Sequence, residues 1–304
     1  MRVPIAFVLA LVLCAQARGD VRSERTGDAV ILSDGGRELL RYQAEPGPLP
    51  DPAIDSLFRR GGYLHPVRTP SGRVVTGDFP ADHRHHHGIW FAWTKTEFDG
   101  RTPDFWNMGQ GTGRVDFAGV ETLGPKGFVS RHRAVDLTSG KPVNVLEERW
   151  NVELVDVSAE RTIFDLEISQ DCATDKSLHL PKYHYGGLGF RAPENWTGSD
   201  FQILTSAGET SRIRANESRA KWIRISGPVD GTSATIAILC HGDNFRAPQP
   251  LRVHPTDPFV CFAPPQLGDM KITPGQSFVS RYRIITSDET LEPEELDRLW
   301  EEFR

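Results

Sequence analysis

Alternation of apolar and polar residues, with a period of two, is the feature that most constrains the fold of this chain. The clearest examples are Trp150, Val152 and Leu154, followed by Phe164, Leu166 and Ile168. A period of two sends successive side chains to opposite faces of a β-strand. Strands of this kind bury one face and leave the other in water, which is typical of antiparallel sheets.

Further segments have the composition of strands, and Gly and Pro clusters separate them. Asp34-Gly35-Gly36 between two apolar runs is typical of a tight hairpin. The predicted strands are 29–32, 38–42, 89–95, 115–120, 128–137, 143–157, 162–169, 221–225, 234–240 and 278–286. The pattern therefore predicts an all-β fold, a large antiparallel β-sandwich.

One helix is predicted at the C-terminal end, over about residues 291–303. Leu296, Leu299, Trp300 and Phe303 lie on one helical stripe, and Pro293 stands near the start. Strand–helix alternation and glycine-rich phosphate loops are absent from the sequence, which argues against nucleotide-binding α/β folds. We expect residues 18–304 to form a single sandwich domain that ends in this helix.

The first residues have the composition of a secretory signal peptide. A positive Met1-Arg2 start precedes the uncharged run 3–14, and Ala15-Gln16-Ala17 supplies a cleavage pattern. We expect cleavage after Ala17, removal of residues 1–17, and a secreted or periplasmic protein. A lipoprotein anchor on Cys14 is less favoured, because the bulky Leu13 precedes it. The apolar run is too short to span a bilayer.

Charge and cysteine content exclude several classes of protein. A formal net charge of −6 argues against nucleic-acid binding, which usually needs a basic surface. Beyond residue 17 the cysteines are Cys172, Cys240 and Cys261. This odd number allows at most one disulfide, and the sequence does not decide the pairing.

The stretch from Asp82 to Trp90 holds four of the ten histidines: His83, His85, His86 and His87. In an extended conformation, His83, His85 and His87 would point to one side and His86 to the other. His83 and His85 could then exchange protons near neutral pH, and Asp82 could orient one of them. The same geometry also suits a divalent metal ion with a third ligand from elsewhere. A solvated loop is the remaining interpretation.

A second candidate segment runs from Pro181 to Arg191. His184 lies between Tyr183 and Tyr185, and glycines precede Arg191, whose guanidinium matches a carboxylate. A glycine-rich turn between strands is the alternative interpretation. The other candidates are Asp104, as a group that orients hydroxyls, and Trp90, Trp106 and Trp196, as rings that stack on a sugar.

Other polar residues give weaker signals. His132 lies between two arginines and is expected to be an exposed strand residue, and His254 is a candidate outer contributor. Glu147 and Glu148 are neighbours on a predicted strand and point to opposite faces, so they cannot form a glycosidase pair by themselves.

Several of these motifs resemble a family of secreted bacterial β proteins, DUF6807, often described as methane oxygenase PmoA-like. The motifs are Tyr63-Leu64-His65-Pro66, 82–90, Asp104-Phe105-Trp106, 185–191 and Phe262-Ala263-Pro264. The resemblance covers about residues 28–286. It implies a fold like the galactose mutarotase sandwiches, which bind sugars in a cleft and use His and acidic side chains. It implies no settled reaction.

These observations predict an exported carbohydrate-active protein, leaning toward an enzyme, with epimerase, lyase and hydrolase chemistry all open. The expected catalytic residues are His83, His85, His184 and Asp104. The expected substrate-binding residues are His86, Trp90, Trp106, Tyr185, Arg191 and Trp196. No cofactor is predicted. A noncatalytic sugar-binding protein and a metalloprotein with His83, His85 or His86, and His184 as ligands are the alternatives.

Overall fold

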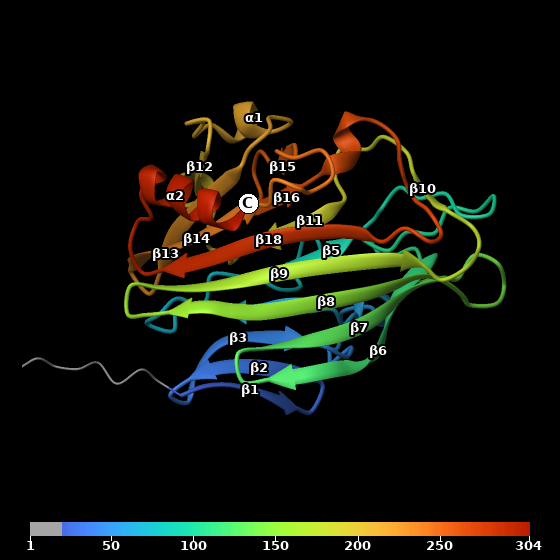
Figure 1. Ribbon diagram of the computed structural model, residues 1–304, viewed down its shortest axis with the longest axis horizontal. Helices are drawn as coiled ribbons and strands as arrows, with labels where there is room; N and C mark the ends of the chain where they lie inside the picture. Colours follow the sequence, from blue (N-terminus) through green and yellow to red (C-terminus); the bar gives the residue numbers. More distant parts are fainter. Residues whose placement is uncertain (1–19) are drawn as a thin grey trace, which may run out of the picture.

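The computed structural model describes residues 20–304, and these form two large antiparallel sheets that pack face to face (Figure 1). The predicted signal peptide, residues 1–17, lies outside the described residues. One hydrophobic core lies between the sheets and draws residues from both, from Val30 to Ile284. The predicted antiparallel β-sandwich with a C-terminal helix is confirmed.

Each large sheet has eight strands. The first sheet runs in the order β1 (Val21–Thr26), β2 (Ala29–Asp34), β3 (Arg37–Gln43), β4 (Tyr63–Val67), β5 (Ile89–Ala92), β11 (Gly187–Arg191), β16 (Phe259–Phe262) and β15 (Leu251–Val253). The second runs β12 (Gln202–Thr205), β13 (Trp222–Val229), β14 (Thr232–Cys240), β18 (Phe278–Ser287), β9 (Arg161–Cys172), β8 (Val143–Val157), β7 (Gly127–Asp136) and β6 (Gly113–Gly124). A small sheet pairs β10 (Leu178–Leu180) with β17 (Met270–Ile272).

The helices are few. The short α1 covers Arg212–Ala215, and α2 covers Pro293–Phe303, as the stripe of apolar residues predicts. Leu296, Leu299 and Trp300 of α2 pack on Trp222 and Ile285 of the second sheet. No helix within residues 20–304 is long and apolar enough to cross a membrane.

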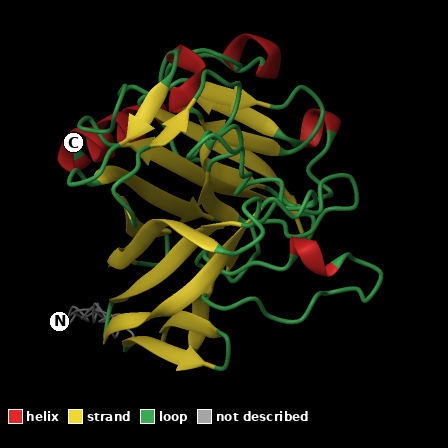
Figure 2. Cartoon of the chain, turned by 90° about the vertical axis from the view of Figure 1, so that its right-hand side faces the viewer, coloured by secondary structure: helices red, strands yellow, loops and turns green. Residues whose placement is uncertain are grey.

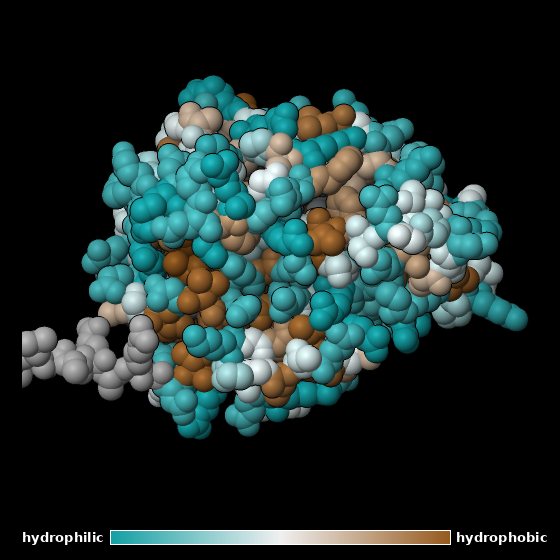
Figure 3. All heavy atoms as spheres, viewed as in Figure 1, coloured by the Kyte–Doolittle hydropathy of each residue, from teal (hydrophilic) through white to brown (hydrophobic). Residues whose placement is uncertain are grey.

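The second sheet has one face in the core, whereas α2 covers part of its other face and water covers the rest. Trp150, Val152 and Leu154 of β8 are buried, whereas Glu153 is exposed. Ion pairs on the outer face join neighbouring strands at Arg133–Glu147, Arg281–Glu167 and Arg283–Asp165. Arg149 of β8 reaches across β7 to Glu121 of β6. Hydrophilic side chains cover most of this side of the molecule (Figure 3). Away from α2, this outer face therefore needs no covering layer.

The central strands of the first sheet are buried on both faces. Every residue of β5, β11 and β16 is buried. The sequence analysis did not identify β11 as a strand, because its glycines favoured a turn or a ligand loop. One face of these strands packs on the second sheet. Their other face is buried only because other parts of the chain cover it, and loops on that side form the cover.

The three cysteines within the described residues are free. Cys240 and Cys261 are buried, and Cys172 is half-buried. Burial raises the pKa of the Cys240 thiol to about 11 and that of Cys261 to about 12. Both are therefore neutral thiols at physiological pH.

His132 is fully buried, and the prediction that it would be exposed is wrong. It faces the core from β7, where its backbone pairs with that of Glu148 on β8. Its Nε2–H donates to the carbonyl of Ala44 (2.9 Å), and the Tyr42 hydroxyl donates to its Nδ1 (3.2 Å). Burial lowers the pKa of His132 to about 4. The folded protein therefore holds this imidazole neutral.

A neutral buried imidazole makes stability depend on pH. Between pH 6.5 and 4 the unfolded chain binds a proton at His132 that the folded protein does not, so stability falls as the pH falls. We expect His132 to contribute on the order of 3 kcal/mol to this loss. Urea unfolding of wild type and His132→Gln at pH 4, 5, 6 and 7 measures this contribution to the free energy of unfolding.

The variant is less stable at pH 7, and its deficit should shrink as the pH approaches 4. His179→Gln is the matched control, since His179 is a partly exposed histidine paired with Glu97. A constant deficit of His132→Gln across this range would contradict the assignment of a neutral His132.

Candidate functional site

The candidate site lies on the outer face of the first sheet, across β4, β5, β11 and β16. Strand register places Tyr63, Trp90, Gly189 and Cys261 in one row across these strands. The alternating residues, such as Phe91 and Leu188, face the core instead. Figure 2 shows loops gathered on one side of the sandwich, opposite the C-terminal end of the chain.

A second buried cluster forms on this outer face. We call it the outer aromatic cluster: Tyr63, Trp90, Ala92, Trp106, Phe259, Cys261 and Ala263. The rings of Trp90 and Trp106 lie 4.8 Å apart between centroids. Both indoles are completely buried, so they support the site from below and present no face for a sugar to stack on. Their predicted stacking role is wrong in this structure.

Gly189 makes room for the two indoles. A Cβ at this position would lie 2.8 Å from Trp90 and 2.9 Å from Trp106, closer than real Cβ contacts. The glycine in the middle of β11 therefore has a packing role, which explains its presence in a fully buried strand.

The histidine loop, residues 78–88, covers one end of the outer aromatic cluster. The extended conformation considered in the sequence analysis is not the one that this loop adopts. Turns shape it, with His83 N–H donating to the Pro80 carbonyl (3.1 Å) and His86 N–H to that of His83 (2.8 Å). The turn places residues three apart side by side, so alternation does not decide which imidazoles meet.

His86 is the centre of a stack of rings. The His83 ring lies parallel to it at 4.7 Å, and Phe259 stacks on it at 4.6 Å. The His85 ring meets both imidazoles edge-on, 5.7 Å from His83 and 4.7 Å from His86. Since His86 is buried, His83 and His85 are the members of this group that solvent or a ligand can reach.

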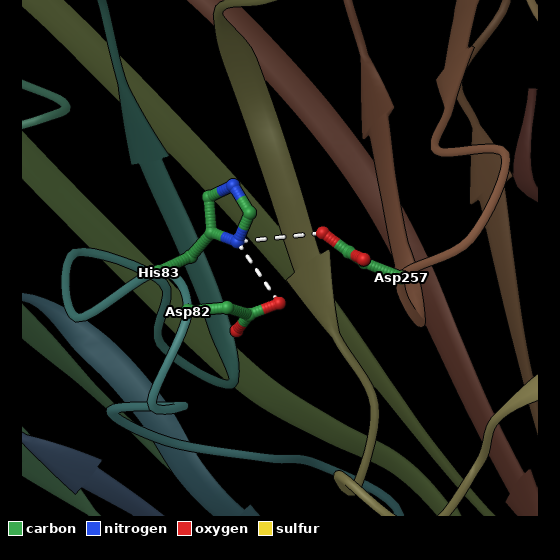
Figure 4. A group of neighbouring side chains, drawn as sticks. All are labelled: Asp82, His83 and Asp257. Carbon is green, nitrogen blue, oxygen red and sulfur yellow. Dashed lines mark ion pairs between the residues drawn. The ribbon is translucent and has the colours of Figure 1, made fainter.

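Two carboxylates converge on His83. Its Nδ1 lies 3.2 Å from Asp82 Oδ2 and 3.3 Å from Asp257 Oδ2, as Figure 4 shows. Asp257 comes from the loop before β16, so distant parts of the chain meet here. His254 supports that loop, because its Nδ1 accepts the Asp257 backbone N–H (2.9 Å).

Arg191 supports the cluster from the end of β11. Its side chain is only 3% exposed, and it donates to Asp82 Oδ1 (3.3 Å) and contacts His86 Nδ1 (3.3 Å). Partial burial of Asp82 raises its pKa, but Arg191 and His83 outweigh this effect and lower it. Arg191 was predicted to bind substrate. Its buried position instead gives it a positioning role, holding the protein's own Asp82.

His85 has a different environment from its neighbours. Burial and the adjacent His83 lower its pKa to about 4, so it is neutral at pH 7. Within residues 20–304 no side-chain hydrogen bond occupies either of its ring nitrogens. Since the ring is only half-buried, His85 has nitrogen atoms free to contact a ligand.

The sequence analysis did not select His87, yet the structure gives it a specific partner. Its Nδ1 lies 2.7 Å from Asp78 Oδ1, and the Tyr63 hydroxyl donates to Asp78 Oδ2 (3.0 Å). His87 Nε2 is buried without a hydrogen-bond partner. Asp78, an acidic residue shortly before the histidines, is the sequence feature that could have indicated a partner for His87.

Several buried polar atoms on this face have no hydrogen-bond partner. Those in the described chain include His83 Nδ1, His87 Nε2, Trp90 Nε1, Trp106 Nε1 and Arg191 Nε. Such atoms are rare in native proteins, and each calls for a reason. Similar atoms also occur elsewhere in the described residues, for example on the buried Arg60, so these atoms belong to the description of the site and do not identify it by themselves.

Two further predicted site residues have structural roles. Asp104 holds a turn, since its Oδ1 accepts the backbone N–H groups of Trp106 (2.8 Å) and Asn107 (2.9 Å). Trp196 belongs to the main core, where its indole N–H donates to the Pro228 carbonyl (2.9 Å). Neither presents the predicted group to a ligand: hydrogen bonds within the turn occupy Asp104, and packing encloses Trp196.

His184 is exposed at the other end of the outer aromatic cluster. Its ring contacts Tyr183 (4.3 Å) and Tyr185 (4.7 Å), and no ring contact within residues 20–304 joins it to His83 or His85. Tyr185 in turn contacts Trp106 at 5.3 Å. The two predicted segments therefore lie at the ends of one series of aromatic rings rather than around one shared imidazole group.

Substituting Gly189 tests how tightly this layer is packed. We expect Gly189→Ala to lower the free energy of unfolding by about 1–3 kcal/mol, because its Cβ overlaps both indoles. Near-UV circular dichroism should change as the indoles move. Gly47→Ala is the control, since its nearest neighbour is 4.0 Å away. Equal stability of the two variants would contradict this packing.

Comparison with known proteins gives a family and a similar solved structure. The family described as "Family of unknown function (DUF6807)" matches residues 29–301. No curated protein matches the chain. The crystal structure of heparan sulfate lyase HepC from Pedobacter heparinus is 9% identical, with a TM-score of 0.41. The similarity covers 90% of this chain and 36% of that one, so the chain spans about a third of the lyase's length.

Proposed function

We propose a function from the site itself, because the chain belongs to DUF6807, a family of unknown function. This membership confirms the family predicted from the sequence, whereas relationships to methane oxygenases and galactose mutarotases stay predictions. The proposed function is that of a carbohydrate-active enzyme. It acts on a sugar or oligosaccharide by proton transfer at the histidine loop.

The observation that carries the proposal is the half-exposed pair of imidazoles, His83 and His85, beside the carboxylates of Asp82 and Asp257. Carboxylates accept hydrogen bonds from sugar hydroxyls, and an imidazole exchanges protons at a carbon or an oxygen. We assign the proton exchange to His85, whose ring nitrogens have no side-chain partner in the described chain. Arg191 acts through Asp82 as a positioning residue.

The proposed ligand extends away from the histidine loop. Tyr183, His184 and Tyr185 form an accessible aromatic group at the other end of the outer aromatic cluster. Ring faces suit sugar rings because they offer flat apolar area beside polar groups. An oligosaccharide would then place one unit at His85 and another on Tyr183 or His184.

Export completes the proposal. The sequence of residues 1–17 predicts a cleavable leader, which would place the protein in the periplasm or outside the cell, where oligosaccharides are available.

The test uses His85→Gln, which keeps a polar side chain of similar length. Wild type should convert at least one member of a pool of neutral and acidic oligosaccharides, followed by mass spectrometry and NMR. We expect the variant to lose turnover by about 100-fold or more while it retains binding, because general acid–base groups contribute about that much. His179→Gln is the matched control and should keep full activity.

Binding measurements separate the enzyme from the sugar-binding alternative. Tyr183→Ala should weaken binding to the same oligosaccharide without changing the fold seen by circular dichroism. Sugar binding without turnover in wild type would overturn the enzyme and support a noncatalytic sugar-binding protein. Absence of both would overturn a carbohydrate function altogether.

A further inference from the structure

We infer that Asp82, His83 and Asp257 bind a divalent transition-metal ion, with Zn²⁺ or Mn²⁺ as its chemical class. Their ligand atoms all lie within 4.8 Å of one another. This set differs from the predicted set of three histidines, because His85 and His184 do not belong to the group. The inference deepens the proposed function by adding an ion to the same site.

The distances between the ligand atoms suit one ion. His83 Nδ1 lies 3.2 Å from Asp82 Oδ2 and 3.3 Å from Asp257 Oδ2. Nitrogen and oxygen ligands at 2.0–2.2 Å from a metal lie about 3 Å apart, the separation seen here. One imidazole nitrogen and two carboxylate oxygens therefore lie close together, as the convergence in Figure 4 illustrates.

The hydrogen bonding of His83 Nδ1 agrees with this arrangement. The atom is buried, and it makes no hydrogen bond although two carboxylate oxygens lie near it. An imidazole that donated to either carboxylate would have satisfied this atom. A metal ion uses the nitrogen lone pair instead, and needs no N–H on that atom.

The surrounding charges support a cation with open coordination positions. Two carboxylates outweigh the single guanidinium of Arg191, which bonds the other oxygen of Asp82, Oδ1 (3.3 Å). Arg191 thus acts as an outer partner that orients a ligand. Asp82 is 49% exposed, which leaves room for water or substrate on that side.

The donor set selects the ion. Imidazole nitrogen favours Zn²⁺ and other transition metals, whereas carboxylates alone would favour Ca²⁺ or Mg²⁺. Three protein ligands beside an accessible side are typical of metal sites that bind substrate. At this position, the ion would contact hydroxyl or carboxylate oxygens of a sugar next to His85.

Titration of the untagged protein tests the inference. We expect isothermal titration calorimetry with Zn²⁺ and with Mn²⁺ to give one site per chain for at least one ion. Asp257→Asn and His83→Gln should each weaken that binding by at least about 10-fold, since even loss of an outer partner costs 10- to 100-fold. Asp243→Asn is the matched control, an exposed aspartate near His241 that should bind like wild type.

Two further measurements keep the outcome decisive. Circular dichroism melting shows whether each variant is folded, and Co²⁺ absorption of wild type should reveal nitrogen and oxygen ligands. No stoichiometric binding by wild type would overturn the inference. Unchanged binding by folded Asp257→Asn together with loss in His85→Gln would also overturn it, because the ion would then sit on other imidazoles.

The two proposals fail separately. A protein that binds the ion but neither binds nor converts any sugar keeps the metal site and loses the carbohydrate function. Turnover that survives in protein shown to bind no ion keeps the enzyme and removes the metal.

Discussion

Burial of the central strands of the first sheet on both faces is the constraint on which the rest of the structure depends. One face packs on the second sheet, and the alternation of side chains then sends Tyr63, Trp90, Arg191 and Phe259 to the other. An aromatic layer on a sheet surface has to be covered, because its exposure to water would remove the favourable free energy of burying these side chains and so lower the stability of the fold. The covering segments are loops, and these loops hold the histidines.

Strand β11 shows how packing and chemistry depend on each other. Gly189 leaves space for two indoles, and two residues later Arg191 projects from the same face beneath the histidine loop. A buried guanidinium needs an anionic partner, and Asp82 supplies it. The need to pair the buried guanidinium of Arg191 thus fixes the position of the Asp82 carboxylate in the site.

Sequence patterns were enough to predict α2 and the strands of the second sheet except the short β12, since the long strands alternate and the helix has one apolar stripe. They did not reveal β11 or β16, because strands buried on both faces lack alternation and are short. Of the site, the histidine loop could be predicted from its composition. The stacking of His83 on His86 could not, since it follows from a turn rather than from strand geometry.

The sequence alone determined the antiparallel sandwich, the terminal helix, the family and the segment that carries imidazoles, because period, composition and motif are local properties of the chain. The tertiary structure decided which side chains meet. The pairing of β16 with β11 brings Asp257 close to His83. Trp196 is buried in the core, and hydrogen bonds hold Asp104 in a turn. Contacts between segments far apart in the chain depend on strand order and register, and neither is written in any local pattern of residues.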